Sequence, residues 1–330
     1  MHTHKMTTSP HPGCKFTRGT GLASLFMRRR PGLGSNRRPA PTVGAAVGRV
    51  VLLGLVAACL AAGQGAPRAA PRLAQVRSWA FAIGAGDLMG DLAARYAPFD
   101  LVVVDAQEAT RAQVTQLHER PRIVLGYLDV GTIEPGRPWF AQARRYRLDY
   151  WPDWGEWYAD VAAAGYRRLL LRTVAPALLE KGFDGLFLDN VDMIASHPRQ
   201  RSGMRLLVAS IAQLVHSSHR LLFAQNGENV IGPILNQLDG WNREDVTSSY
   251  DFARHRYLPQ PTATVHQTLK TLRSLHARGL FVTTTDYVAA NNSPAAAQAI
   301  RNACSTGALP YLADIQLQRI PHTAPHCPGR

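Results

Sequence analysis

The sequence predicts a single (β/α)8 TIM-type barrel of the α/β class, with one possible extra strand. From about residue 78 onward, short apolar runs alternate with helix-like stretches, and acidic residues recur where the runs end. Near-continuous apolar strands between helices are typical of a parallel sheet covered on its outer face. A barrel of this kind usually needs about 250 residues, which matches the part of the chain that shows the alternation.

Residues 1–59 are predicted to be an export segment. The apolar run "RVVLLGLVAACLAAG" follows an Arg-rich region, the order found in secretory signals. It is too short for a transmembrane helix, which needs about 20 apolar residues. The run contains "LVAAC", a pattern similar to a bacterial lipobox, in which Cys59 would be acylated; cleavage after Ala62 or Ala66 is the alternative, and Met27 is an alternative start. We expect an exported protein, either periplasmic, secreted or an outer-membrane lipoprotein anchored at Cys59.

The remaining chain divides by composition into an Ala/Pro/Gly-rich linker at 60–77, a folded domain at 78–320 and a tail at 321–330. Nine of the 37 Lys and Arg lie in residues 1–58, which hold no acid, so residues 59–330 keep only +5 of the net charge of +14. This modest charge does not favour a nucleic-acid partner, and we expect a monomer. Cys304 and Cys327 either form a disulfide or remain two free thiols.

Nine apolar runs are candidate strands for eight barrel positions, so one of them is peripheral or misread. Gly182 and Gly279 each end a helix just before a run, as expected of a left-handed C-cap. The candidate strands are residues 79–84, 101–106, 122–130, 157–161, 185–190, 221–228, 240–245, 280–287 and 309–314.

Carboxylates stand at or just after the end of nearly every candidate strand. The carboxyl ends of barrel strands meet at one mouth, where active sites are built. Asp105, Asp160 and Asp314 are more simply explained as caps of following helices, but eight acids on one rim cost free energy unless a cation or a raised pKa relieves them. The acids are Asp105, Asp129, Asp160, Asp189, Glu228, Glu244, Asp286 and Asp314.

A mouth of this composition predicts a glycosidase. Glycoside hydrolysis uses one carboxylic acid to protonate the leaving oxygen and a second carboxylate as nucleophile or as a base that activates water. Additional acids would suit a substrate that carries ammonium groups, such as an amino sugar. In "FDGLFLDNVD" (183–192), Asp189 ends the strand, and Asp192 either binds such an ammonium group or caps the next helix.

Aromatic residues are concentrated between residues 139 and 158, after the third strand. Sugar rings stack on aromatic faces, so this region is a candidate saccharide platform; the alternative is that a long loop needs a small core of its own. The residues are Trp139, Phe140, Tyr146, Tyr150, Trp151, Trp154, Trp157 and Tyr158.

The motifs "GYLDVGTIEPGR", "GFDGLFLDNVD", "AQNGE" and "TTTDY", in this order, resemble those of the endo-α-1,4-polygalactosaminidase-type glycoside hydrolases of bacteria and fungi. Relatives of that family include the hydrolase domain of the Pel polysaccharide system. The resemblance covers about residues 79–314. It implies a (β/α)8 barrel that cleaves galactosamine-rich exopolysaccharide. This polysaccharide is the partner that the resemblance implies, and no cofactor is expected.

The resemblance also assigns roles to residues. It makes Asp189 catalytic and pairs it with a Glu on a later strand, either Glu228 or Glu244, of which Glu244 is preferred. The family usually has Ser followed by Gly-Glu where this chain has Asp129 and Gly131-Thr132, which puts the substrate preference in doubt. The expected substrate-binding residues, with no metal ligand among them, are Asp105, Tyr127, Asp129, Glu134, Arg137, Asn190, Asp192, Asn226, Glu228, Asp286 and Tyr287.

Two other functions remain open from the sequence. One is a catalytically silent carbohydrate-binding barrel lipoprotein, because a barrel can be kept for binding alone. The other is a metal-assisted hydrolase or lyase that uses Asp189 and Asp192, although no phosphate-holding element accompanies these carboxylates.

Overall fold

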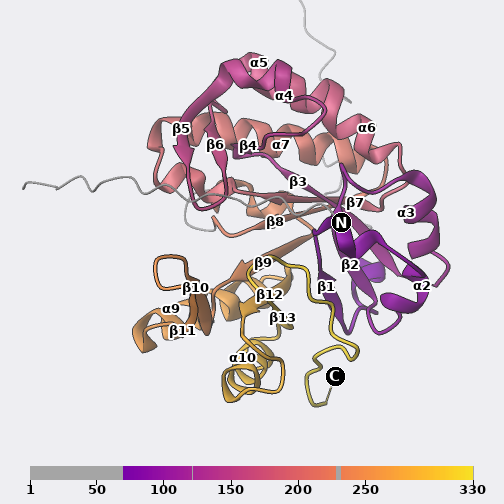
Figure 1. Ribbon diagram of the computed structural model, residues 1–330, viewed down its shortest axis with the longest axis vertical. Helices are drawn as coiled ribbons and strands as arrows, with labels where there is room; N and C mark the ends of the chain where they lie inside the picture. The colour runs from indigo at the N-terminus through magenta and orange to yellow at the C-terminus, as the bar shows by residue number, and fades with distance from the viewer. Residues whose placement is uncertain (1–69, 121, 228–231, 330) are drawn as a thin grey trace, which may run out of the picture. The chain divides into compact units, whose positions relative to one another are not determined.

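Eight parallel strands form the centre of the protein. The computed structural model describes residues 70–120, 122–227 and 232–329. In it the strands pair in chain order, and Figure 1 shows them gathered inside the helices. They are β1 (Trp79–Phe81), β2 (Leu101–Asp105), β3 (Ile123–Asp129), β7 (Gly185–Asp189), β8 (Leu221–Gln225), β9 (Gly240–Glu244), β12 (Phe281–Tyr287) and β13 (Leu309–Ala313).

Side chains join the first and last strands and nearly close the barrel. Trp79 of β1 donates its indole N–H to the carbonyl oxygen of Leu309 in β13 at 3.0 Å. The ring of Trp79 also lies 5.7 Å from that of Tyr311, and both side chains are buried. Inside the barrel, Phe81 and Phe187 place their ring centroids 4.9 Å apart. The predicted TIM-type barrel is confirmed.

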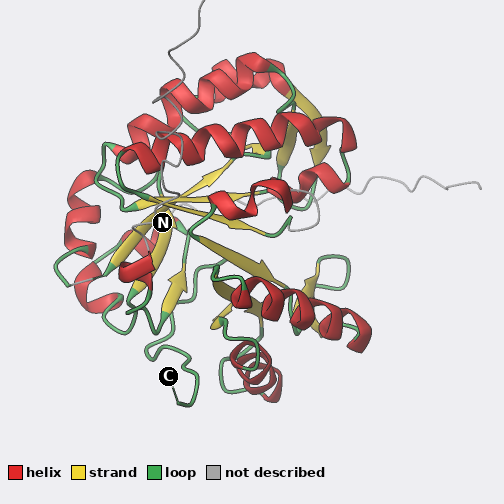
Figure 2. Ribbon diagram, turned by 180° about the vertical axis from the view of Figure 1, so that it is seen from behind, coloured by secondary structure: helices red, strands yellow, loops and turns green. Residues whose placement is uncertain are grey.

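Helices surround these strands, as Figure 2 shows from behind. A π-helical turn, η3, precedes Pro176, which cannot donate a backbone hydrogen bond within a helix. The α-helices are α1 (Ala70–Leu73), α2 (Leu92–Arg95), α3 (Arg111–Leu117), α4 (Phe140–Ala143), α5 (Ala164–Leu169), α6 (Ala175–Leu179), α7 (Arg201–Ser217), α9 (Thr262–Ala277) and α10 (Pro294–Cys304). The other helical turns are η1 (Ala85–Leu88), η2 (Arg144–Tyr146), η3 (Leu170–Val174), η4 (Val191–Ala195), η5 (Pro198–Gln200) and η6 (Gly232–Gln237).

The two predicted glycine caps are confirmed, because Gly182 and Gly279 have φ values of +106° and +86°. Within the described residues, no helix combines the length and apolar character needed to cross a bilayer.

Two antiparallel excursions leave the barrel at the carboxyl ends of strands. After β3 the chain forms a three-stranded sheet of β4 (Thr132–Ile133), β6 (Glu156–Ala159) and β5 (Arg147–Trp151). After β9 it forms a hairpin of β10 (Ser248–Asp251) and β11 (Arg256–Pro259). The predicted strand at 157–161 belongs to the first excursion, so it is the extra strand among the nine candidates.

Glycine allows β7 to lie close to its neighbours. A Cβ atom at Gly185 would stand 2.0 Å from the carbonyl oxygen of Leu221, on β8. At the mouth, a Cβ at Gly131 would stand 2.0 Å from the carbonyl oxygen of Asn190. The close approach of these segments brings the residues that follow β3 and β7 together.

Packing extends beyond the domain limits of 78 and 320 at both ends. Leu73 and Val76, in the segment predicted as linker, are buried in the core, and Arg72 forms an ion pair with Asp184 at 2.5 Å. Near the other end, Cys327 forms a disulfide with Cys304 of α10. Of the two predicted states of these cysteines, the structure therefore contains the disulfide. The export segment 1–59 lies outside the described residues.

We expect loss of the disulfide to lower the free energy of unfolding by about 3 kcal/mol, the size typical for a loop of this length. The double substitution Cys304→Ser/Cys327→Ser should lower the midpoint of urea unfolding, because the unfolded chain gains freedom. The matched control is the unmodified protein with and without reductant. An unchanged midpoint in the variant would contradict the expected role of the disulfide in stability.

Candidate active site

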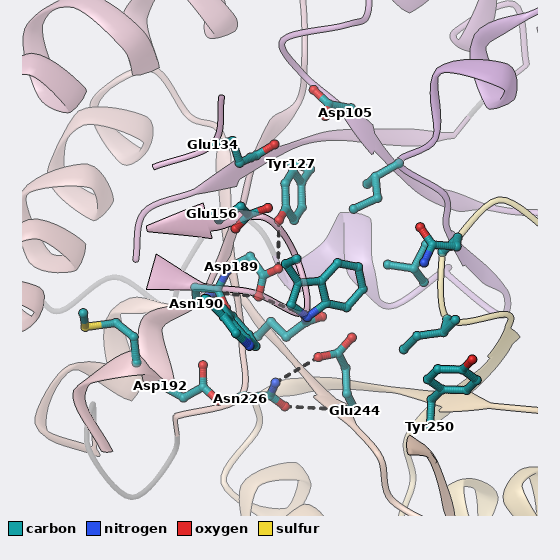
Figure 3. A pocket seen from close by; sticks show the side chains of 18 of the residues that line it. Asp105, Tyr127, Glu134, Glu156, Asp189, Asn190, Asp192, Asn226, Glu244 and Tyr250 are labelled. Atoms are coloured by element: carbon teal, nitrogen blue, oxygen red, sulfur yellow. Dashed lines mark hydrogen bonds between the residues drawn. The ribbon is translucent and has the colours of Figure 1, made fainter. Parts of the chain in front are cut away.

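The carboxyl ends of the barrel strands and the two excursions surround a cavity of about 760 Å³ (Figure 3). Among the described residues that line it, Arg137 is the one basic side chain. Ten of the predicted site residues line this cavity: Asp105, Tyr127, Glu134, Arg137, Asp189, Asn190, Asp192, Asn226, Glu244 and Tyr287. Asp129 and Asp286 are not part of the lining, and Glu228 lies outside the described residues.

Asp189 ends β7 and accepts three hydrogen bonds. Tyr127 donates its hydroxyl to Oδ2 at 2.9 Å, as Figure 3 shows. Gln225 donates to Oδ1 at 2.9 Å, and the backbone N–H of Asn190 donates to the same oxygen at 2.6 Å. Burial, followed by the charge of Asp129, raises the pKa of Asp189 to about 7, while the donors from Asn190 and Tyr127 oppose this rise. Three fixed donors favour the ionised form, in a fixed orientation.

Glu244 ends β9 and has two side-chain hydrogen-bond donors. Its carboxyl group accepts from the hydroxyl of Tyr287 and from Nδ2 of Asn226, the latter at 3.0 Å. Asn226 is oriented by Arg243, which donates to its carbonyl oxygen at 2.8 Å. Burial, followed by the charge of Asp189, raises the pKa of Glu244 well above its usual value. Burial and the nearby charge of Asp189 therefore favour the protonated form of Glu244.

Asp129 and Glu156 share one proton through Thr132. The hydroxyl oxygen of Thr132 lies 2.5 Å from Oδ2 of Asp129 and 2.6 Å from Oε2 of Glu156. A hydroxyl group has one hydrogen, so it can donate to only one of these oxygens. The other carboxyl group must itself be protonated and donate to Thr132.

The donors around each carboxyl group indicate which one holds the proton. Asp129 also accepts from the backbone N–H groups of Gly131 and Thr132 and from the side chain of Asn190, at 2.6 to 2.9 Å. These donors lower the pKa of Asp129 against the larger effect of its burial. Glu156 has no N–H donor among the described residues, and burial followed by the charge of Asp129 raises its pKa to about 9. The proton therefore resides on Glu156, which lines the cavity.

Arg137 neutralises the side of the mouth near β2. Its guanidinium contacts both oxygens of Asp105, at 3.0 and 2.8 Å, and approaches Glu134 to 2.6 Å. Burial still raises the pKa of Glu134 to about 7. Asp105 also accepts from the backbone N–H groups of Gln107 and Glu108 at 2.8 and 3.1 Å. It therefore closes a turn, and the predicted helix cap is wrong for it, because the N-cap of α3 is Thr110.

Two of the predicted substrate-binding carboxylates point into the protein. Asp286 accepts from the backbone N–H groups of Thr247 and Ser248 at 2.6 and 2.9 Å and thereby fixes the start of β10. Asp129 holds Asn190, as described above. Both are almost completely buried, so each supports a neighbouring segment rather than lining the cavity.

Sequence reasoning missed three acids that line the cavity, namely Glu108, Glu156 and Asp245. Glu156 lies in the aromatic region of the sequence. The signal that could have identified it is its alternation with Trp157 along β6. Asp245 follows Glu244 in a left-handed conformation with φ +55°. Its Oδ1 atom is buried without a hydrogen-bond partner among the described residues, and burial raises its pKa to about 6. All three are therefore additional acids of the mouth.

The aromatic region divides between core and cavity. Trp139 is buried, and Phe140 and Tyr146 pack against the core. Trp151, Trp154 and Tyr158 line the cavity, with the rings of Trp151 and Tyr158 stacked 5.2 Å apart. Tyr150 and Trp157 pair on a separate side, where Arg147 lies over the ring of Trp157. The platform predicted from eight aromatic residues is thus limited to three from this region.

We assign no metal site. Carboxylate oxygens of Asp129, Glu134 and Glu156 lie within 4.8 Å of one another, close enough to share a metal ion. Each of these groups already has a partner in the protein, namely Thr132 or Arg137. The metal-assisted alternative used Asp189 and Asp192, and both oxygens of Asp189 also accept hydrogen bonds from the protein.

The raised pKa values of the buried acids predict how the stability of the fold depends on pH. Their pKa values are raised in the folded protein, so the folded state keeps protons that the unfolded chain loses near pH 4. The stability that they contribute is complete below this pH and is lost as pH rises through the folded values, about 7 for Asp189 and about 9 for Glu156. We expect the melting temperature to fall between pH 5 and pH 9, as measured by calorimetry.

The substitution Asp189→Asn should flatten part of this decrease and raise the melting temperature at pH 8, because it removes a buried charge. Glu119→Gln, at an exposed position, is the matched control and should leave the profile unchanged. A melting temperature that rises steadily from pH 5 to pH 9 would contradict the assignment of protons to the mouth.

The known proteins that are similar to this chain include the following three. The glycoside hydrolase domain of PelA from Pseudomonas aeruginosa is 23% identical, with a TM-score of 0.64 over 74% of this chain and 97% of that one. Ega3 of Aspergillus fumigatus, in a crystal structure with galactosamine, is 18% identical, with a TM-score of 0.59 over 76% and 95%. An uncharacterized protein of Deinococcus radiodurans is 24% identical over 278 residues, which are 77% of this chain and 85% of that protein.

The two structural similarities show a shared fold. The model of glycoside hydrolase family GH114 matches residues 60–328, which is most of the chain and includes every strand of the barrel. The protein therefore belongs to glycoside hydrolase family GH114.

Proposed function

We propose that this glycoside hydrolase is exported and cleaves a galactosamine-containing polysaccharide with free amino groups, using Asp189 and Glu244 as its catalytic pair. The observation that carries the proposal is the arrangement of the two carboxyl groups in one acidic cavity. Their environments differ, so that one favours the ionised form and the other the protonated form. In glycosidases such a difference separates the nucleophile or base from the general acid.

The distribution of charge supports a cationic substrate. No α-helix in the described part of the chain contains Asp or Glu, although most contain Arg or Lys. Acids are instead concentrated around the cavity, where Arg137 is the one basic side chain among the described lining residues and pairs with Asp105, Glu134 and Glu108. A cavity of one sign attracts ligands of the opposite sign. The galactosamine in the crystal structure of Ega3 is an amino sugar that suits such a cavity.

In the proposed mechanism Glu244 is the general acid. Its proton passes to the glycosidic oxygen while a carboxylate oxygen of Asp189 attacks the anomeric carbon and the bond to the leaving sugar breaks. The ionised Glu244 then takes a proton from water, whose oxygen displaces Asp189 and releases the product. Tyr127 and Gln225 hold Asp189 in one orientation, and Tyr287 donates to the charge that Glu244 acquires.

The proposed mechanism retains the anomeric configuration, because Asp189 acts in it as the nucleophile. The two carboxyl groups line one cavity, and the charge of Asp189 contributes to the raised pKa of Glu244. Retaining enzymes place their carboxyl groups about 5 to 5.5 Å apart, whereas inverting enzymes leave roughly 6.5 to 9.5 Å for a water molecule. Glu244 is preferred over Glu228 as the partner because its carboxyl group lines the cavity with that of Asp189.

The alternative of a catalytically silent binder has less support. Both carboxyl groups have the hydrogen-bond partners that their proposed roles need, and a binder would gain nothing from a buried, protonated Glu244.

The export part of the proposal rests on residues 1–59, with Cys59 as a candidate anchor. Mass spectrometry of the native protein tests it: a mature chain that begins at or soon after Cys59 supports export, and an intact cytoplasmic chain contradicts it.

We expect Asp189→Asn and Glu244→Gln each to lower kcat on galactosamine oligomers by about 10³-fold or more, because each removes a group that acts in the transition state. Reducing-end release measures the rate, and thermal melting checks the fold. Asp245→Asn, which changes a neighbouring acid of the same cavity, is the control and should cost less. Full activity in Glu244→Gln would exclude it as the acid and leave Glu228 as the candidate.

Partly deacetylated oligomers should be cleaved with a kcat/KM about tenfold higher than fully acetylated oligomers at low ionic strength. The difference should shrink in high salt, because salt screens the attraction between ammonium groups and the acidic mouth. Equal values for the two substrates at both ionic strengths would contradict a cationic substrate.

Proton NMR of the first products tests retention of the anomeric configuration, and an inverted anomer would contradict it.

A further inference from the structure

A row of aromatic rings crosses the mouth of the barrel. It consists of Tyr158, Trp151, Trp154, Phe252, Tyr250 and Tyr257, and we call it the aromatic arch. Successive rings are in contact, with centroids 5.0 to 6.4 Å apart. All members except Tyr257 line the cavity that holds Asp189 and Glu244.

Each half of the arch is fixed to the barrel at its base. The first half of the arch belongs to β5, β6 and the turn between them. β6 pairs with β4, which comes directly after β3, and Tyr158 contacts His197 after η4. The second half stands on β10 and β11. There Asp286 of β12 holds the start of β10, and Tyr257 accepts from the backbone N–H of Ile315 at 3.2 Å. The first excursion follows β3 and the second follows β9, and β7 and β8 lie between these two strands in the barrel.

The halves meet at one place. Trp154, in the turn between β5 and β6, packs edge-to-face against Phe252 in the turn between β10 and β11, with centroids 5.4 Å apart. Among the described residues, no hydrogen bond or ion pair joins the two hairpins. Trp154 remains 38% exposed, so Phe252 covers only part of it. One aromatic contact of this kind changes a population by a factor of about ten or less.

We propose that the aromatic arch is a strap whose joint, Trp154 against Phe252, opens to admit an internal segment of the polysaccharide and closes over it. The inference rests on the proposed polysaccharide substrate and adds how that substrate enters. A closed arch allows a chain to pass beneath it only from an end. A joint held by one ring contact gives internal segments access, and its closure keeps the chain in the cavity, as lids do in other enzymes.

The test is to lock the joint before or after the polymer enters. In a chain with Cys14→Ser, Cys59→Ser and Asp189→Asn, the pair Trp154→Cys and Phe252→Cys is joined by a photocleavable thiol cross-linker. The ligand is a long, partly deacetylated galactosamine polymer attached to a support. After washing in high salt, which screens ionic contacts, we expect at least about tenfold more protein on the polymer when cross-linking follows binding than when it precedes binding. Cleavage of the cross-linker by light should then release the retained protein from the polymer.

Chains with only one of the two new cysteines, treated in the same way, are the controls and should wash off. Equal retention for both orders of cross-linking would overturn the strap, because the polymer would then not pass beneath the joint. Washing off in both orders, despite binding at low salt, would overturn it as well. Absence of binding at low salt would instead contradict the proposed substrate, and with it a strap for that polymer.

Activity provides a second measurement in the chain that keeps Asp189. The ratio of the cleavage rate on long polymer to that on short oligomers should fall at least about tenfold when the joint is cross-linked, and recover after light. Comparison within one variant removes any effect of the cysteines themselves. An unchanged ratio would mean that opening is not needed for entry.

Discussion

The burial of several carboxyl groups at one end of the barrel is the constraint on which the rest of the site depends. Parallel strands that end in Asp or Glu bring these groups together, and one basic side chain, Arg137, lies among the described residues of the cavity. Like charges in a buried space must be separated, protonated or hydrogen-bonded. The residues around the mouth supply each of these solutions at a different carboxyl group.

The different solutions produce a division of labour. Asp189 receives three donors and is held as an oriented acceptor, whereas Glu244 receives two, and burial favours its protonated form. Thr132 forces Asp129 and Glu156 to share a proton, which removes one negative charge from the mouth. The excess of acid that remains is the reason to expect a cationic sugar.

The barrel and its acidic mouth could be predicted because both depend on local patterns. Apolar runs with terminal acids predict strands whose ends converge, and Gly182 and Gly279 indicate where helices end. The direction of each side chain could not be predicted, because it depends on contacts between distant segments. Asp129 and Asp286 follow the same pattern as Asp189, yet they turn inward because backbone N–H groups of nearby turns face them.

Glu156 and the aromatic arch show the same limit. They belong to excursions whose position over the mouth is set by pairing of β4 with β6 and by the attachment of β10 to β12, and neither follows from the spacing of residues.

The segment 70–77 was predicted as a linker for a different reason. Its Ala and Pro content is typical of a linker, but Leu73 and Val76 lie three residues apart and both reach the core.

The central claim is that the folded mouth keeps Glu244 protonated while Asp189 ionises. It is tested most directly by carbon NMR of protein labelled at its side-chain carboxyl groups, with Asp189→Asn and Glu244→Gln used to assign the two signals. The account predicts that the signal of Asp189 titrates near pH 7 and that of Glu244 only at higher pH. A Glu244 signal that titrates below that of Asp189 would contradict the account.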